Sequence, residues 1–491
     1  MNQRTPAPPT LPSDVAPAPG ATAAPVAPAK APWTALVVVG VAQLMVMLDS
    51  TVVNVALPSI GADLPADRTA LQWTISAYLL PFGSLLLFGG RVSDVHGRRR
   101  AFLAGLALFT AASALCGVAG GPELLIGGRA AQGVGAALLS AAALSIVLEV
   151  YRDEEQRRIA LTAWSGLGVI GATIGVVLGG LVVTAVDWRW AFLVNVPVGV
   201  AAFAAALRAV PSLRAASGRR LRLPSAAVAT AGLAALSFGL IRLHEGLGDR
   251  AAWTGLAAAA ALLALVTSME LGQDDPLLPL HLLRRPAYRL ACAGLLLVAA
   301  VMIGSSFLAA QYFQEVHRMS AFATGLSLLP MGLAALAAAA AAPALIGALG
   351  PGGTYALGAV LHLLGAGLLA TGPDSVPLTI AALAVVGAGL PACFVPLFGV
   401  GAAHVSAAES GVGSGLLNTF NESGVALGIA VIGTVLATTA DGRLDRGASV
   451  PDATASGVAG GFLALAVCSA AGLALALALR RATPADRRAA A

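Results

Sequence analysis

The stretch G-R-V-S-D-V-H-G-R-R-R, residues 90–100, decides the fold. It is a short basic segment between two apolar runs, 71–90 and 101–121, and each run is long enough to cross a bilayer as a helix, which takes about 20 residues. We therefore predict a tight turn at the cytoplasmic face, where short loops rich in arginine are retained. Gly90 and Gly97 allow the chain to turn without steric cost. Asp94 lies among four arginines and is expected to be ionised and paired.

The composition is that of an all-α integral membrane protein. Apolar residues make up 58% of the chain and charged residues 11%, whereas charged residues are about 25% of soluble proteins. A membrane β-barrel would show short segments of alternating polarity, and the sequence has none. The basic residues are spread over alternate loops, so the net charge of +5 does not indicate a nucleic-acid partner.

The apolar segments predict a multi-pass chain with a six-plus-two-plus-six organisation. Residues 1–32 are expected to form a disordered cytoplasmic tail, because they are rich in Pro and Ala and carry little charge. An N-terminal six-helix bundle over 33–210 is followed by a linker with two extra transmembrane helices over 211–286. A C-terminal six-helix bundle over 287–480 precedes a second cytoplasmic tail, 481–491. The fourteen predicted segments are 33–60, 71–90, 101–121, 124–148, 159–186, 190–207, 223–241, 251–269, 290–313, 321–343, 354–372, 376–400, 411–439 and 456–479.

The distribution of Lys and Arg predicts that both termini are cytoplasmic. With the amino terminus inside, 21 of the 29 basic residues fall in inside loops and tails, and Arg129 and Arg242 fall within segments. This asymmetry is the one expected from retention of basic loops in the cytoplasm. The six basic residues outside are Arg68, Arg189, Arg250, Arg318, Arg443 and Arg446.

Two ionisable residues lie inside predicted helices of the first half. Asp49 belongs to L-D-S-T-V-V-N-V-A-L-P, residues 48–58. An acid at the centre of a spanning helix is disfavoured by about 2.5–3.5 kcal/mol, so it usually faces a cavity or a partner. Arg129, Gln132, Gly133 and Ala136 share one helix face by their spacing. The alternatives are that Asp49 extends to the outer membrane face and that Arg129 extends to the outer surface near Glu123.

The second half offers one acid inside a predicted helix. Glu422 lies near the middle of its segment in N-T-F-N-E-S-G, residues 418–424, and Asn418 lies one turn away on the same face. We interpret Glu422 either as a functional acid or as a buried glutamate satisfied by hydrogen bonds within its helix.

Glycines and aromatic residues of the fifth and sixth segments predict structural roles. Gly171, Gly175 and Gly179 are spaced by four, which is typical of a face for close helix packing. The motif W-R-W-A-F-L-V-N-V-P, residues 188–197, places aromatic side chains at a membrane boundary, where they anchor a helix end. We expect a structural role for this motif.

No cofactor or metal is expected. The stretch G-L-G-V-I-G, residues 166–171, lies inside a spanning run rather than after a strand, and the chain has no phosphate-binding P-loop motif. The four cysteines lie in apolar runs without a C-x-x-C pair, and the six histidines form no i, i+4 pair.

These motifs together resemble those of the major facilitator superfamily, in its 14-helix branch of drug–proton antiporters. The resemblance covers nearly the whole chain and implies that the loop 90–100 acts as a conformational latch through Gly90, Asp94, Gly97 and Arg98. The stretch 344–353 is the equivalent loop in the second half, and it keeps glycines but lacks the acid and the arginines.

The same resemblance implies which residues couple transport to protons. It assigns Arg129, with Gln132, to the central cavity and proton coupling. The stretch 48–58 matches the family's first-helix signature at every fixed position. Burial raises the pKa of a carboxyl group, so we expect Asp49 within this stretch to accept and release protons. Two departures are Val92, where the family prefers Leu, and Val176, where a Pro is usual. The second weakens the export direction that the glycine face implies.

The resemblance implies proton-coupled efflux of hydrophobic or amphiphilic drugs by alternating access. The expected partners are the drug, protons and the lipid bilayer, and we expect a monomer in the cytoplasmic membrane. One alternative is a symporter or facilitator that imports a small polar solute on the same fold. Two others are a membrane-embedded enzyme, for which no cluster of catalytic residues appears, and a non-transporting scaffold or receptor. The sequence does not identify the substrate.

Overall fold

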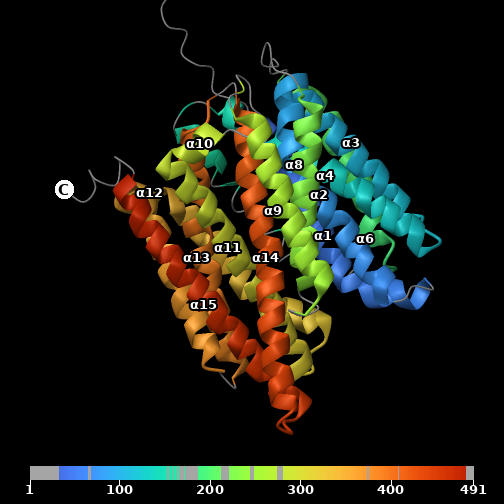
Figure 1. Ribbon diagram of the computed structural model, residues 1–491, viewed down its shortest axis with the longest axis vertical. Coiled ribbons are helices and arrows are strands. Elements are labelled where there is room, and N and C mark those ends of the chain that lie inside the picture. The colour runs from blue at the N-terminus through green and yellow to red at the C-terminus, as the bar shows by residue number, and fades with distance from the viewer. Residues whose placement is uncertain are drawn as a thin grey trace, which may run out of the picture.

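The computed structural model is helical in all its regular elements, with no strand among the residues it describes (Figure 1). These residues are 33–64, 68–151, 153, 155–157, 159–161, 163–164, 171, 186–211, 221–243, 248–271, 273, 280–372, 375–406 and 409–482. The helices are α1 (Trp33–Asp63), α2 (Arg68–His96), α3 (Arg98–Gly117), α4 (Pro122–Val150), α6 (Trp190–Leu193), α7 (Asn195–Ala209), α8 (Leu223–Leu243), α9 (Arg250–Glu270), α10 (Leu280–Arg284), α11 (Pro286–Gln311), the π-helix η1 (Tyr312–Val316), α12 (Ala321–Ala370), α13 (Val376–Ala403), α14 (Ser410–Leu444) and α15 (Val450–Ala482).

Twelve helices in the described residues are long and apolar enough to cross a membrane. One of them, α12, is 50 residues long and contains the predicted segment 321–343 and most of the segment 354–372, separated by a non-helical residue at Gly350 (φ 72°, ψ 169°). The predicted segment 159–186 falls largely outside the described residues. The count of fourteen therefore stays a prediction, while a multi-pass helical membrane protein is confirmed.

The turn predicted over 90–100 is wrong in its extent. Helix α2 continues to His96 and α3 begins at Arg98, so only Gly97 separates them. Gly97 has φ 93° and ψ 136°, a positive-φ conformation that glycine adopts readily because it has no Cβ. Gly90 lies inside α2 and does not turn the chain. A single left-handed glycine suffices because the two helices need only reverse direction at the membrane face.

Contacts divide the helices into two groups that meet along α2 and α14. Helices α2 and α3 both pack on α4, and α1 packs on α7, whereas α12, α13 and α15 pack together with α11 and α14. Helix α14 also contacts α2 and α4. Helix α8, paired with α9, contacts both α2 and α14 and so lies over the seam between the groups (Figure 1). The predicted linker also contains one short helix that the sequence did not indicate, α10.

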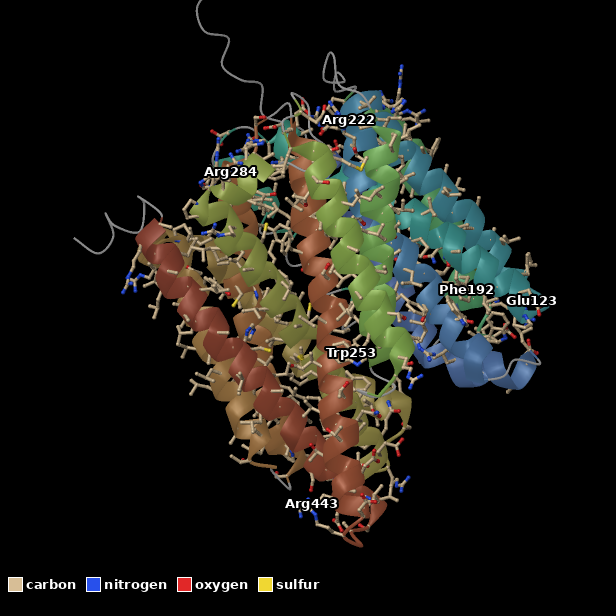
Figure 2. All side chains as sticks on the ribbon, viewed as in Figure 1. Glu123, Phe192, Arg222, Trp253, Arg284 and Arg443 are labelled. Carbon is tan, nitrogen blue, oxygen red and sulfur yellow. The ribbon has the colours of Figure 1, made fainter. Side chains whose placement is uncertain are left out.

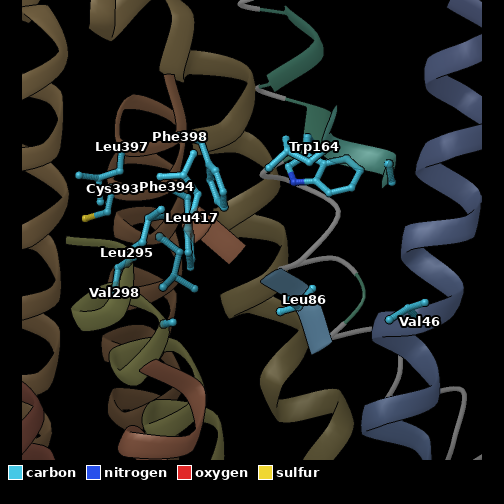
Figure 3. Close-up of a cluster of buried hydrophobic side chains, with 14 of the residues drawn as sticks. Val46, Leu86, Trp164, Leu295, Val298, Cys393, Phe394, Leu397, Phe398 and Leu417 are labelled. Carbon is cyan, nitrogen blue, oxygen red and sulfur yellow. The ribbon is translucent and has the colours of Figure 1, made fainter. Parts of the chain in front are cut away.

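Buried apolar side chains fill the interior, and apolar side chains also cover much of the surface. Figure 3 shows the part of the core where side chains of α11, α13 and α14 interlock, among them Leu295, Cys393 and Leu417. Large apolar residues are exposed on the outer faces of the helices, as a helix surrounded by lipid requires. They include Val37, Leu333, Leu364, Leu463 and Val467.

Basic side chains mark both ends of the molecule. Arg222 and Arg284 lie at one end and Arg443 at the other (Figure 2). The first end is the one that the sequence predicts to be cytoplasmic, and Arg443 is among the residues expected outside. Trp33, the first described residue, stacks on Tyr151 at the end of α4, with ring centroids 5.3 Å apart.

Candidate functional site

A buried ion pair joins Asp49 of α1 to Arg129 of α4. Each residue is 1% exposed, and Nη1 of Arg129 donates to Oδ2 of Asp49. The other carboxylate oxygen, Oδ1, accepts hydrogen bonds from Gln132 Nε2 at 3.0 Å and from Asn195 Nδ2 at 3.1 Å. A buried charge is tolerated where an opposite charge and further hydrogen bonds replace water. Asp49 therefore has a complete set of partners inside the helices.

The Arg129 guanidinium is held from several sides. Its Nε donates to the carbonyl of Thr74 at 3.1 Å, and Nη1 also donates to Gln132 Oε1 at 2.9 Å. The guanidinium carbon lies 4.2 Å from the centroid of the Tyr78 ring and 5.7 Å from that of Phe192. Cations over aromatic rings are attracted by the ring quadrupole, most strongly where water is excluded. These contacts fix the direction in which the arginine points.

Gly133 brings α4 close enough to α2 for this arrangement. A Cβ added at Gly133 would collide with the carbonyl oxygen of Tyr78. It would also lie 3.2 Å from the carbonyl carbon of Tyr78. The face predicted from the spacing of Arg129, Gln132 and Gly133 is thus the face that packs against α1 and α2. Gln132 extends the network by donating to Ser113 Oγ at 2.7 Å.

Asn195 contacts Asp49 directly, which its sequence motif did not predict. The expected structural role of the motif 188–197 stays a prediction, but Asn195 within it is 4% exposed and contacts Asp49. Phe192, three residues earlier, faces the guanidinium of Arg129. One feature of the sequence could have indicated this contact: Asn195 is an amide at the start of a helix, three residues after the aromatic Phe192.

Both surface alternatives for the first-half residues are wrong. Arg129 does not extend to the outer surface near Glu123, because its side chain ends on Asp49 inside the helices. Glu123 lies in the first turn of α4 and is exposed. Asp49 likewise does not reach a membrane face.

Glu422 and Asn418 lie on α14, apart from the Asp49 network. Glu422 is half-buried, and its Oε1 accepts a hydrogen bond from Asn421 Nδ2 at 3.1 Å. Asn418 is buried, and its Nδ2 has no hydrogen-bond partner among the described residues. The two acids, Asp49 and Glu422, thus belong to different helices, α1 and α14.

Asp94 binds the amino-terminal end of α14. Its Oδ1 accepts the N–H of Gly411 at 2.8 Å and its Oδ2 accepts the N–H of Val412 at 3.0 Å. Unpaired N–H groups at a helix start favour a negative charge there. Arg98 Nη2 lies 3.5 Å from Asp94 Oδ1, and it also pairs with Glu149 of α4. The expected pairing of Asp94 is present, and it links residues 317 and 318 positions apart.

Gly90 allows the backbones of α2 and α14 to touch. A Cβ at Gly90 would collide with the carbonyl oxygen of Gly411 and lie 2.8 Å from its carbonyl carbon. A Cβ at Gly411 would collide in turn with Gly90 O and the Asp94 carboxylate. The glycine that the sequence assigned to a turn is therefore a packing glycine at the seam.

Of the three glycines in the predicted packing face, the structure describes Gly171. It is buried, and a Cβ there would lie 2.7 Å from the Cβ of Met47 on α1. Gly175 and Gly179 lie outside the described residues.

A further ion pair joins the carboxyl end of α1 to the segment that precedes α6. Arg189 Nη1 lies 2.8 Å from Asp63 Oδ2, and Trp188 Nε1 donates to the same oxygen at 3.1 Å. The guanidinium of Arg189 also lies 4.5 Å from the centroid of the Trp188 ring. Hydrogen bonds from Trp188 and then from Arg189 lower the pKa of Asp63 below its ordinary value.

Among the described residues, no group of three or more His, Cys, Asp or Glu side chains is arranged to hold a metal ion. Three cysteines, Cys116, Cys292 and Cys393, are buried, and Cys468 is half-buried. Cys116 lies beside the site, with its Sγ 3.5 Å from Gln132 Oε1.

Known proteins with similar sequences cover most of the chain. It is 36% identical over 462 residues to the cephamycin export protein CmcT of Amycolatopsis lactamdurans. This match covers 88% of this chain and 91% of that protein. It is 35% identical over 441 residues to the puromycin resistance protein pur8 of Streptomyces alboniger, covering 88% and 87%. It is 34% identical over 467 residues to a probable actinorhodin transporter of Streptomyces coelicolor, covering 91% and 80%.

Solved structures share the fold at low sequence identity. The human organic anion transporter MFSD10 (TETRAN) matches with a TM-score of 0.61 and 18% identity, over 89% of this chain and 99% of that one. The transporter FucP in the outward conformation matches with a TM-score of 0.57 and 14% identity, over 90% and 98%. The sequence model of the Major Facilitator Superfamily matches residues 39–429. This chain belongs to the major facilitator superfamily.

Proposed function

We propose that this chain exports hydrophobic or amphiphilic drugs across the cytoplasmic membrane in exchange for protons. Its similarity to an antibiotic export protein and to an antibiotic resistance protein supports drug efflux. The observation that carries proton coupling is the buried pair of Asp49 and Arg129, because an acid held inside helices is typical of proton pathways in transporters.

Protonation of Asp49 is the coupling step. A proton that binds the carboxylate removes its negative charge and with it the attraction to Arg129. The guanidinium keeps its charge at any working pH and retains Thr74 O and Gln132 Oε1 as acceptors. A proton that crosses inward gains about 2.3 kcal/mol per 100 mV of membrane potential. That free energy drives the drug outward.

The contact between Asp94 and α14 is the conformational latch. It joins the two helix groups at the end predicted to be cytoplasmic and has to break before a central site opens on that side. Arg98 supports it by pairing with both Asp94 and Glu149. Gly90 and Gly97 serve the same latch, the first by letting α2 touch α14 and the second by ending α2.

Glu422 and Asn418 form the contribution of α14 to the substrate cavity. A half-buried carboxylate beside an amide suits the recognition of a cationic drug or of a second proton. Both termini are cytoplasmic in this proposal, the chain acts as a monomer, and two six-helix bundles rock about the central site while two extra helices link them.

Drug accumulation in cells tests the proposal. Cells that express the wild type should accumulate less of at least one compound from a broad hydrophobic panel than cells with empty vector. Asp49→Asn should restore accumulation to the empty-vector level, and Glu422→Gln should narrow the range of exported cations. Glu123→Gln is the matched control, because Glu123 is an exposed acid of α4 and should leave efflux unchanged.

Proton flux in sealed vesicles tests the coupling and its direction. Addition of an exported drug on the side of the cytoplasmic face should release protons there in the wild type and not in Asp49→Asn. Uptake of protons together with the solute would indicate an importer. Equal accumulation in wild-type and empty-vector cells across the panel would remove export.

A further inference from the structure

The helices of the second half enclose a cavity of about 300 Å³ at the end opposite Asp94. Gly424 of α14 lies against Leu296 of α11, and Gly304 of α11 lies against Ile432 of α14, so these two helices run in the same direction. The π-helix η1 that follows α11 is therefore at the end remote from the start of α14. The cavity lies between η1 and the adjoining ends of α12, α13 and α15.

The π-helix shapes one wall of the cavity. Five residues of π-helix are rare in proteins and occur mainly at functional sites. Here η1 ends with the N–H of His317 bonded to the carbonyl of Tyr312 at 3.2 Å. The imidazole of His317 meets the Tyr312 ring edge to face, with centroids 4.7 Å apart and an interplanar angle of 73°. Both side chains line the cavity.

A residue that lines the cavity, His317, carries a buried polar atom without a partner among the described residues. Nε2 of His317 is buried and has no hydrogen bond among the described residues. Such an atom destabilises the protein unless a bound group satisfies it. Asp452, in the first turn of α15, also lines the cavity and is exposed. One of its oxygens accepts from Ser449 Oγ at 2.6 Å, and a carboxylate has further lone pairs to offer.

The remaining walls are aromatic and aliphatic. Phe462 and Val458 of α15 and Leu369 of α12 contribute apolar surface, and the lining has no basic residue other than His317. A volume near 300 Å³ is at the lower end of the range for small-molecule sites. The site therefore suits a compact ligand with one apolar ring and one polar, positively charged end.

We propose that this cavity binds a small aromatic ammonium compound. The ring lies between Tyr312 and Phe462, and the ammonium group points toward Asp452. One N–H of the ammonium group donates to Nε2 of His317. The site is separate from the Asp49 and Arg129 network, because it lies in the other helix group and shares no residue with it. Its occupancy does not depend on the proposed drug efflux.

Binding to the purified full chain in lipid nanodiscs tests this site, with phenethylammonium as the probe and 2-phenylethanol as its uncharged counterpart. Calorimetry is run on the wild type and on Asp452→Asn, His317→Phe and Ala459→Leu. His317→Phe keeps a ring against Tyr312 and removes the nitrogen, and Ala459→Leu fills the cavity. The matched controls are Asp445→Asn, an exposed acid near the same end, and Ala470→Leu, an exposed alanine of α15.

The amine should bind the wild type more tightly than the alcohol does. Asp452→Asn should weaken amine binding about three- to fivefold, as expected for an exposed ion pair. Ala459→Leu should weaken it by more than about tenfold, and His317→Phe should weaken it as well. Both controls and Asp49→Asn should bind as the wild type does. Unchanged binding by Ala459→Leu, or loss of binding in Asp49→Asn, would overturn the proposal.

Discussion

Asn195 donates from Nδ2 to Oδ1 of Asp49 over 3.1 Å, which joins residues 146 positions apart in the sequence. The same oxygen accepts from Gln132, while Oδ2 faces Arg129. One carboxylate thus ties α1 to α4 and to α7. Because two of its three partners are neutral amides, they stabilise the charged carboxylate without adding a second positive charge to the interior.

Replacement of Asn195 by Leu should reduce proton-coupled efflux about tenfold or more. A hydrogen bond to a charged group contributes about 1.5–3 kcal/mol, and 1.4 kcal/mol corresponds to about a factor of ten. Drug-induced proton release in vesicles is the measurement. Trp190→Phe is the control, because Trp190 belongs to the same motif but is exposed. Wild-type coupling in Asn195→Leu would show that this amide only fills space.

Arg129→Lys should abolish coupling although the positive charge is kept. A lysine ammonium cannot reach Asp49, Gln132 and the Thr74 carbonyl at once, and it lacks the planar face that lies over Tyr78. Transport rates at equal expression are the measurement, and Arg250→Lys, at an exposed position, is the control. If Arg129→Lys transports at the wild-type rate, charge alone is sufficient at this position.

The sequence predicts the positions of most helices and the residues whose presence inside them is costly. Asp49 and Arg129 could be found because charged residues are rare inside spanning helices. Asp94 could be found because it stands between two apolar runs. These signals are local: each depends on a few residues of one segment and not on which helices meet.

Contacts between distant segments could not be predicted in this way. Asn195 follows aromatic residues at a helix start, so its local pattern indicates an anchor, and only the packing of α7 on α1 brings it to Asp49. The sequence alone does not distinguish the roles of Gly90 and Gly97, since both are glycines in the same short stretch. The structure distinguishes them, because Gly97 has a positive φ and Gly90 contacts another helix.

Asp94→Asn should open the end of the molecule where α2 meets α14. The amide keeps the shape of the carboxylate but loses its charge, which weakens hydrogen bonds that contribute about 1.5–3 kcal/mol each when charged. Spin labels are attached to His96→Cys and Ala403→Cys, both exposed positions. In Asp94→Asn the distance between the two labels should be longer, with a broader distribution, than in the labelled protein that keeps Asp94. Asp153→Asn, at an exposed acid, should leave the distances unchanged, and identical distances in Asp94→Asn would contradict the latch.

Gly90→Ala should have the same structural effect as Asp94→Asn by a different cause. The added methyl group would collide with the backbone of Gly411, which cannot move as a flexible side chain would. Gly83→Ala is a matched control in the same helix, because its nearest neighbour would be Ser237 Oγ at 3.7 Å, an ordinary contact. If Gly90→Ala gives the same label distances as Gly83→Ala, α2 and α14 accommodate the added methyl group without separating.

Asp63, at the carboxyl end of α1, should make the stability of the protein depend on pH. Trp188 and then Arg189 hold the pKa of Asp63 below its ordinary value of 3.8. A carboxyl group with a lowered pKa in the folded state contributes stability above its unfolded pKa, and the contribution is lost as pH falls through the folded pKa. Asp63→Asn should therefore lower the melting temperature at neutral pH.

The difference between wild type and Asp63→Asn should shrink once the pH falls below 3.8, because protonated Asp63 resembles the amide in charge. Melting curves of the two proteins in the same detergent, taken across this range, are the measurement. Asp445→Asn should show no such convergence, since Asp445 is an exposed acid at the end of α14. A difference that persists unchanged in acid would mean that the asparagine disturbs packing against Trp188 rather than the charge of the pair with Arg189.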